Sequence, residues 1–277
     1  MLPVTTTNAL ADKLVEYISG HSRVAVAFSG GVDSSVVAAA AARANCESLI
    51  AITANSASVS KWQQELASTI AAEIGISHQI VSTNELQIDQ YAKNDGQRCF
   101  FCKQTLYQAI ESVARNAGGA TIMSGTNADD LGDYRPGIEA GNIAGVVTPL
   151  ADLGICKADV RRLATHFGLS NAELPASPCL ASRIAYGVEV TGERLARVES
   201  AESLLRDLGF TDLRVRVHEN ELARIEVPLQ ELGRLDTGMA QEIVQRFTEF
   251  GFRYVTLDLA GLRSGNLNLA LVSIDTK

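Results

Sequence analysis

The sequence FSGGVDSS at residues 28–35 lies between a strand-like apolar run, RVAVAF at 23–28, and an Ala-rich, helix-like run at 34–44. Gly30 and Gly31 can adopt backbone angles that are closed to other residues, which lets the main chain approach a ligand closely. The helix that follows offers free N–H groups and the positive end of its dipole, and both favour phosphate. The stretch therefore predicts a phosphate-binding loop.

The side chains of this loop extend the prediction to a nucleotide with its metal. A serine at the helix start can cap the helix or bind a phosphate oxygen. Asp33 does not favour bare phosphate, so we expect it to hold Mg²⁺ on a pyrophosphate group. The loop lacks the Lys of the ordinary P-loop, and a Ser-capped turn without a ligand is the alternative. The predicted ATP-binding residues are Ser29, Gly30, Gly31, Asp33, Ser34 and Ser35.

Strand-like and helix-like runs alternate from this loop onward. Further strands are expected at 48–53, 78–82, 120–124 and 145–149, and helices at 61–74, 105–116 and 157–167. Such alternation implies an α/β fold, a doubly wound parallel sheet with helices on both faces. We expect this domain to cover residues 1–180.

The pattern changes after residues 174–178, which contain two prolines. Helices are then expected at 193–208 and 239–250, a hairpin of strands at 213–218 and 222–227, and a last strand at 254–259. We therefore expect a smaller C-terminal α+β domain over residues 185–277, for substrate binding or oligomerisation.

Composition narrows the class of protein. The 277 residues are 46% hydrophobic, but no run of about 18 apolar residues occurs, so no membrane-spanning helix is expected. The first residues lack a signal-peptide pattern, and we expect a cytoplasmic protein. The net charge of −8 disfavours a long nucleic acid as partner, because phosphate neutralisation requires Lys and Arg.

The acidic segment GTNADD at 125–130 follows the strand expected at 120–124. In a doubly wound sheet, the first strand and its neighbour across the topological switch flank the ligand crevice. A carboxylate such as Asp130 would then share the metal with Asp33. A solvated acidic loop is the alternative.

Three of the five cysteines stand in patterns that suggest chemistry. Cys99 and Cys102 form a CxxC just before the expected helix, a motif that fits zinc, redox or iron–sulfur sites. Cys179, in SPCLASR at 177–183, adds a third thiol at the domain junction. Three thiolates can hold a 4Fe–4S cluster and leave one iron without a protein ligand. A cysteine that donates its own sulfur, structural zinc and buried thiols are the alternatives.

A basic strand completes the candidate site. Residues 213–218, LRVRVH, alternate strictly, so Arg214 and Arg216 share one face while the valines face the core. Two arginines on one face suit phosphate or carboxylate, and a solvated surface strand is the alternative. Arg183, four residues after Cys179, would lie near any chemistry at that thiol.

Six segments together resemble the LarE family, the ATP-dependent sulfur transferases of nickel-pincer cofactor assembly, which serves lactate racemase. The segments are FSGGVDSS, RCFFCK, NADDLGDYRPG, SPCLASRIAYG, LRVRVHEN and GFRYVTLDLAGLRSG. The first alone resembles the SGGxDS loop of the PP-loop ATP pyrophosphatases, which split ATP into AMP and pyrophosphate. The resemblance extends over nearly the whole chain.

The resemblance implies a two-step reaction. A carboxylate of pyridinium-3,5-dicarboxylate mononucleotide is adenylated with loss of pyrophosphate, and cysteine-bound or cluster-bound sulfur then displaces AMP to give a thiocarboxylate. Some members sacrifice the sulfur of a single cysteine that matches Cys179. Others have three cysteines, as this chain does, and resemble cluster-using enzymes.

The resemblance also implies roles for individual residues and partners. Asp33 and Asp130 match metal-binding positions, and Arg183, Arg214 and Arg216 match residues near the substrate phosphate. The implied cofactors are ATP, Mg²⁺ and a 4Fe–4S cluster on Cys99, Cys102 and Cys179. The implied partners are a small mononucleotide and further copies of the chain, and no membrane.

Other functions compete with this interpretation. A tRNA thiolase also pairs such a loop with three cysteines, but the acidic charge and the lack of a basic RNA-binding appendage argue against it. An ATP-binding sensor module, or ammonia-dependent NAD or GMP synthesis, leaves the three cysteines unexplained.

Overall fold

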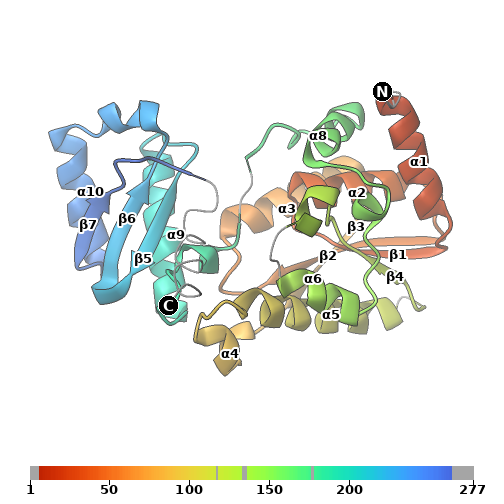
Figure 1. Ribbon diagram of the computed structural model, residues 1–277, viewed down its shortest axis with the longest axis horizontal. Helices are drawn as coiled ribbons and strands as arrows, with labels where there is room; N and C mark the ends of the chain where they lie inside the picture. Colours follow the sequence, from red (N-terminus) through yellow and green to blue (C-terminus); the bar gives the residue numbers. More distant parts are fainter. Residues whose placement is uncertain (1–5, 117, 133–135, 176–177, 264–277) are drawn as a thin grey trace. The chain divides into compact units, whose positions relative to one another are not determined.

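The computed structural model describes residues 6–116, 118–132, 136–175 and 178–263, which divide into two compact units (Figure 1). The first unit comprises Met1–Asn84 and Cys99–Ser177, and the second comprises Glu85–Arg98 and Pro178–Lys277. No helix in the described part of the chain combines the length and the apolar character needed to span a bilayer.

A parallel sheet forms the centre of the first unit. Its strands are β1 (Arg23–Ala27), β2 (Ser48–Asn55), β3 (Ser77–Ser82) and β4 (Thr121–Met123), in the order β3-β2-β1-β4. β1 pairs with β2 on one side and with β4 on the other. The predicted parallel α/β sheet is therefore confirmed, and β4 is the neighbour of β1 across the switch in strand order.

The strand expected at 145–149 is wrong. Only Val147 makes a bridge, to Met123, and the chain turns into the short helix α7 (Pro149–Asp152). Pro149 lacks an N–H group for a further ladder hydrogen bond, and its fixed φ suits the first position of a helix.

Helices cover both faces of the sheet because side chains alternate along each strand. Val24 and Val26 of β1 belong to one buried cluster with Leu150 of α7 and side chains of four longer helices. These are α1 (Thr7–Ser19), α2 (Val32–Arg43), α3 (Lys61–Ile74) and α8 (Lys157–His166). Ala25, between the two valines, packs in a second cluster with Tyr107 and Ile110 of α5 (Arg98–Asn116).

Helix α5 begins seven residues before the expected start at Thr105, so Cys99 and Cys102 lie inside the helix, near its start, rather than before it. The residues between Arg98 and Thr105 include no Gly or Pro, and nothing in them opposes a helix. The first unit also contains η2 (Ala128–Gly132) and α6 (Pro136–Ile143).

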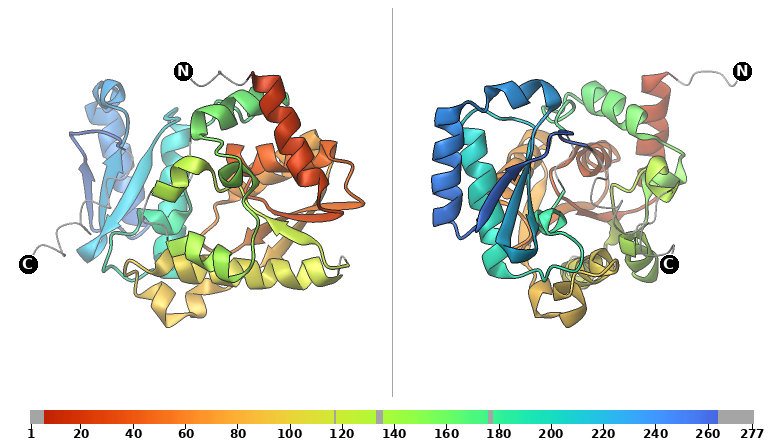
Figure 2. Two further views of the ribbon diagram at one scale, coloured as in Figure 1. Left: turned by 45° about the vertical axis from the view of Figure 1, so that its right-hand side comes forward. Right: turned by 60° about the vertical axis from the view of Figure 1, so that its left-hand side comes forward.

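The described part of the second unit contains a mixed three-stranded sheet and two long helices (Figure 2). β5 (Arg214–His218) pairs antiparallel with β6 (Leu222–Glu226), as the predicted hairpin requires, and β6 pairs parallel with β7 (Tyr254–Leu257). The two helices are α9 (Gly192–Asp207) and α10 (Thr237–Glu249). The shorter helical segments are η1 (Glu85–Gln87), α4 (Asp89–Ala92), η3 (Leu180–Arg183), η4 (Glu219–Glu221) and η5 (Leu229–Arg234).

Register sorts the β5–β6 hairpin into an apolar and a charged side. Val215 pairs with Ile225 and Val217 with Ala223, and all four side chains are buried. The opposite side carries Arg214, Arg216, Arg224 and Glu226, which we call the charged face. Arg216 is 4% exposed, so the alternative of a solvated surface strand is wrong.

Candidate functional site

The phosphate loop connects β1 to α2 and has the backbone that its glycines permit. Gly30 has a φ of +70°, and a Cβ there would lie 2.7 Å from the backbone of Ala67 in α3. Gly31 is the N-cap residue of α2 and has no side chain to cap the helix. A non-glycine residue at 30 would be strained and would clash with α3, and the uncapped end of α2 suits a phosphate group.

The loop serines support this backbone. Ser34 and Ser35 lie in the first turn of α2, and their hydroxyl groups donate to the carbonyl oxygen of Gly31 at 3.0 and 2.9 Å. The Ser29 hydroxyl accepts from the Gly31 N–H at 3.3 Å. The Asn171 side chain adds a donor bond to the Gly30 carbonyl at 2.7 Å. The loop is thus held in shape from within and from a distant segment.

The segment after β4 packs directly on this loop. A Cβ at Gly125 would lie 2.5 Å from the backbone nitrogen of Ser34, so only glycine allows the approach. Asn127 then donates from Nδ2 to Oδ1 of Asp33 at 3.0 Å. The segment after β4 therefore lies against the phosphate loop.

Asp33 also forms an ion pair that the sequence did not reveal. Its Oδ2 contacts the ammonium group of Lys157, the first residue of α8. The backbone N–H of Lys157 donates to Asp129 at 2.8 Å. A lysine at the first position of a helix opposes the helix dipole, and this mismatch was the available signal. Lys157 places a cation beside the phosphate loop, where it can neutralise phosphate charge.

Asp130 lies in η2 and is linked to Asp33 through Asn127. Its Oδ2 accepts from the backbone N–H of Asn127 at 3.1 Å, and Asn127 in turn contacts Asp33. The oxygen donors of Asp33, Asn127 and Asp130 are of the kind that Mg²⁺ prefers. Metal binding at Asp33 and Asp130 stays a prediction.

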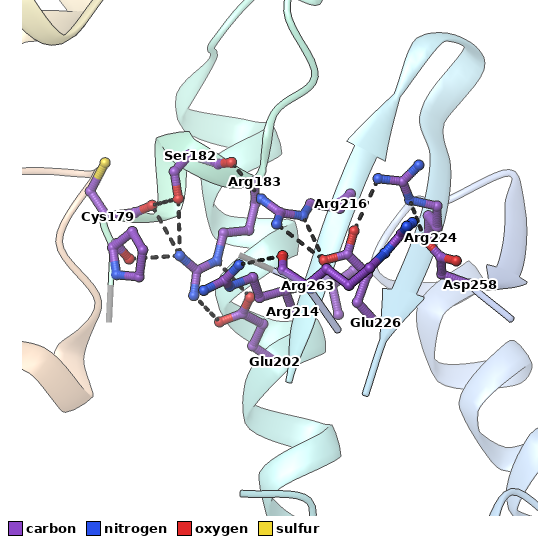
Figure 3. Close-up of polar contacts among 12 residues, drawn as sticks. Cys179, Ser182, Arg183, Glu202, Arg214, Arg216, Arg224, Glu226, Asp258 and Arg263 are labelled. Carbon is purple, nitrogen blue, oxygen red and sulfur yellow. Dashed lines mark hydrogen bonds and ion pairs between the residues drawn. The ribbon is translucent and has the colours of Figure 1, made fainter. Parts of the chain in front are cut away.

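In the second unit, the charged face contains an almost fully buried ion pair between Arg216 and Glu226 (Figure 3). Arg216 donates through Nε and Nη2 to Glu226, both at 3.1 Å, and Arg224 donates to the other oxygen of Glu226 at 3.0 Å. Glu226 is 0% exposed. Burial lowers the pKa of Arg216, and the hydrogen bond to Glu226 opposes that shift. The pairing lets the fold keep these charges away from water.

Arg183 forms the second buried pair. Its Nε donates to Glu202 of α9 at 2.8 Å, and its side chain is 4% exposed. Its Nη1 donates to the carbonyl oxygen of Pro178 at 2.7 Å, next to Cys179. Arg183 therefore connects α9 to the segment that carries the predicted sulfur-handling thiol.

Arg214 differs from its neighbours on the charged face. Within the described residues it makes no ion pair, and its Nη1 donates only to the carbonyl oxygen of Arg263, at 3.4 Å. Burial is the main cause that lowers the pKa of its guanidinium, and the nearby charge of Arg183 adds to it. A half-buried guanidinium with donors to spare is suited to an anionic ligand.

The three cysteines lie on two segments of the chain. Cys99 is exposed and Cys102 half-buried near the start of α5, and Cys179 is half-buried directly before η3. Cys46 and Cys156 are half-buried in the first unit. Within the described part of the chain, no three Cys, His, Asp or Glu side chains gather into a metal-binding group. The cluster on Cys99, Cys102 and Cys179 stays a prediction.

Sequence comparisons with known proteins find a family and several relatives of this chain. A family model described as asparagine synthase matches residues 7–129, which include the phosphate loop. The chain is 43% identical to an uncharacterized protein of Synechocystis sp., over 94% of this chain and 97% of that protein. It is 37% identical to the pyridinium-3,5-bisthiocarboxylic acid mononucleotide synthase of Lactiplantibacillus plantarum, over 92% of each chain. It is 26% identical to one component of the glutamine-hydrolyzing GMP synthase of Methanococcus vannielii, over 71% of this chain and 66% of that protein.

Proposed function

Because the chain belongs to the LarE family, that of the pyridinium-3,5-bisthiocarboxylic acid mononucleotide synthase, we propose that it makes thiocarboxylates from pyridinium-3,5-dicarboxylate mononucleotide. The chain is an ATP-dependent sulfur-transferring enzyme by its family and by its asparagine synthase match. The observation that carries the proposal is the glycine-built phosphate loop with Asp33 at the start of α2.

The first step is adenylation in the first unit. The backbone of the phosphate loop and the uncapped end of α2 bind the phosphates of ATP. Asp33 and Asp130 would hold Mg²⁺, which neutralises phosphate charge when bound. Lys157 adds a fixed positive charge beside Asp33. A carboxylate oxygen of the substrate attacks the α-phosphorus, the bond to pyrophosphate breaks, and an acyl-adenylate forms.

The second step is sulfur delivery. Thiolates of Cys99, Cys102 and Cys179 would hold a 4Fe–4S cluster, which supplies an iron without a protein ligand for an extra sulfide. Thiolates are the donors that such a cluster takes, and the presence of three free cysteines supports the proposal on chemical grounds. Sulfur then attacks the acyl carbon and AMP leaves with the bonding electrons. Donation of the sulfur of Cys179 itself is the competing route.

The charged face is proposed to bind the phosphate of the mononucleotide. Arg214 is the direct contact in this proposal, because it has donors that no described carboxylate occupies. Arg183 forms an ion pair with Glu202, and Arg216 forms one with Glu226. In this proposal both contribute positive charge without contacting the phosphate. Assembly into a homo-oligomer is proposed from the resemblance alone.

Stoichiometry separates the two sulfur routes. Anaerobic reconstitution with iron and sulfide, followed by repeated turnover with ATP and substrate, should give more than one thiocarboxylate per chain and an unchanged mass for the Cys179 peptide. Each of Cys99→Ser, Cys102→Ser and Cys179→Ser should abolish the iron-dependent absorbance, whereas Cys46→Ser, the matched control, should keep it. At most one sulfur per chain, with a Cys179 lighter by H₂S, contradicts the cluster. ADP in place of AMP and pyrophosphate contradicts the adenylation.

A further inference from the structure

The turn that carries Cys179 is held through its main-chain carbonyl groups. Cys179 precedes η3, and its carbonyl oxygen accepts from the backbone N–H of Ser182 at 2.9 Å and from the Ser182 hydroxyl at 2.7 Å. Arg183 donates from Nη1 to the Pro178 carbonyl at 2.7 Å and lies 3.4 Å from that of Cys179 (Figure 3). Arg216 donates to the Ser182 carbonyl at 2.8 Å. Two buried guanidinium groups thus contact one short turn.

A third arginine reaches the same turn from a different segment. Arg98, 6% exposed, donates from Nη1 to the carbonyl oxygen of Ala181 at 2.7 Å. The same nitrogen donates to Oδ1 of Asn94, which is 0% exposed. Asn94 has a φ of +54°, a conformation that Asn tolerates better than most residues. All of these residues belong to the second unit.

Asn94 is itself fixed by the chain that follows the turn. Its Nδ2 donates to the carbonyl oxygens of Ala185 and Val188, at 2.8 and 2.9 Å. The Asn94 carbonyl accepts from the Gly187 N–H at 3.2 Å. Arg98 therefore contacts the turn from a support that has little freedom to move. Arg98 also directly precedes Cys99 in the chain.

We propose that Arg98, Arg183 and Arg216 are positioning residues that hold the Cys179 turn in the geometry needed for sulfur delivery, with Asn94 fixing Arg98. The inference rests on the proposed function in one respect, namely that the Cys179 thiol handles sulfur. Buried arginines ordinarily serve carboxylates, yet each of these three directs a donor at a carbonyl of residues 178–182. A displacement of about 1 Å can cost about 10²-fold in rate, so such support has a function to serve.

Arg98 is the residue to change, because Arg183 and Arg216 also belong to the proposed phosphate site. In the full-length chain, Arg98→Met should raise the rate of Cys179 alkylation by iodoacetamide, mapped by mass spectrometry, by about tenfold or more. Thiocarboxylate formation should fall by about 10²-fold, while substrate-dependent pyrophosphate release stays within about twofold of the parent. Arg98→Lys keeps a cationic donor and should partly reverse both changes, the faster alkylation and the slower thiocarboxylate formation.

Arg234→Met is the matched control. Arg234 also donates to main-chain carbonyls of the second unit, those of Leu208 and Gly209, but not to residues 178–182. It should leave Cys179 alkylation and thiocarboxylate formation unchanged. If Arg98→Met does not fold, Asn94→Gly keeps the left-handed backbone, removes the support of Arg98 and should give the same pattern.

Unchanged alkylation and sulfur delivery in the folded variant would overturn the inference, as would an equal loss of pyrophosphate release and sulfur delivery. The proposed function is tested separately by Cys179→Ala. If that variant still transfers sulfur, Cys179 is not the sulfur-handling thiol, and the alkylation rates alone decide whether Arg98 holds the turn.

Discussion

We propose that the phosphate loop of the first unit and the charged face of the second both bind an anion, but the two are built in opposite ways. The loop relies on backbone groups, two glycines and an uncapped helix end, and its charged side chains are few and partly exposed. The charged face relies on guanidinium groups, and Arg216 there and the neighbouring Arg183 form ion pairs with buried carboxylates. Mutations in the loop should therefore affect chemistry, whereas most mutations in the charged face should affect folding first.

Removing Glu226 should have the largest effect on stability. Glu226→Ala leaves Arg216 and Arg224 facing each other without their shared carboxylate, which should cost about 3–5 kcal/mol of unfolding free energy. Urea denaturation measures the loss. Glu249→Ala removes an exposed pair with Arg246 and should cost less than about 1 kcal/mol. Equal effects of the two changes would mean that burial does not distinguish them.

A change at Asp33 in the phosphate loop should affect activity rather than stability. Asp33→Ala removes the carboxylate at the start of α2. We expect pyrophosphate release to fall by about 10²–10³-fold, because we propose that this carboxylate holds the Mg²⁺ that neutralises the reacting phosphates. Urea denaturation should show little change in stability. Asp12→Ala, at an exposed position of α1, is the control for both measurements. Full pyrophosphate release by the Asp33 variant would remove the adenylation mechanism.

The same contrast explains what the sequence could and could not predict. The backbone of the loop could be predicted, because Gly30, Gly31 and Asp33 stand within four consecutive residues and the two glycines reflect a local requirement of the backbone. The partner Lys157 was missed, because the ion pair joins residues more than 120 positions apart in the chain. Alternation placed Arg214 and Arg216 on one side of a strand, but it could not reveal that Arg216 is paired with Glu226 of the neighbouring strand.

The fold shows the same division between local and distant causes. Most helices and strands were predicted, including α3 at its observed ends, because apolar periodicity is a local signal. No pattern indicated that residues 85–98 join the second unit, since Asn94 and Arg98 find their partners some 90 residues later. The early start of α5 was missed because the CxxC suggested a loop where no residue breaks a helix.

Within the charged face, Arg214 should affect ligand binding rather than folding. Arg214→Ala should weaken binding of the mononucleotide by about 1.5–3 kcal/mol, because it removes the proposed charge-assisted hydrogen bonds to the ligand and breaks no ion pair among the described residues. Isothermal titration calorimetry with the mononucleotide measures the effect, and ATP binding should be unchanged. Arg253→Ala, an exposed arginine of the same unit, is the control. Unchanged affinity in the Arg214 variant would contradict the proposed phosphate site.

The smallest expected effect compares one histidine from each unit. Burial alone lowers the pKa of His78, whereas burial and then the charges of Arg224 and Arg216 lower that of His218. The Thr53 hydroxyl donates to the Phe28 carbonyl at 2.7 Å, so Nε2 of His78, 2.7 Å from that hydroxyl, must be a donor. The neutral form of His78 therefore carries its proton on Nε2.

Both histidines should titrate below 6.5 in NMR spectra of the folded chain, and salt should separate them. Added salt screens the two arginines and should raise the apparent pKa of His218, while that of His78, which depends on burial, should stay constant. Because both folded-state pKa values are depressed, the unfolded chain binds more protons, and stability should fall as the pH drops below about 6.5. His218→Gln should reduce this dependence, with His21→Gln, an exchange at a half-exposed position of the first unit, as control. Equal salt responses of His78 and His218 would show that the charged face exerts no net positive potential on its own strand.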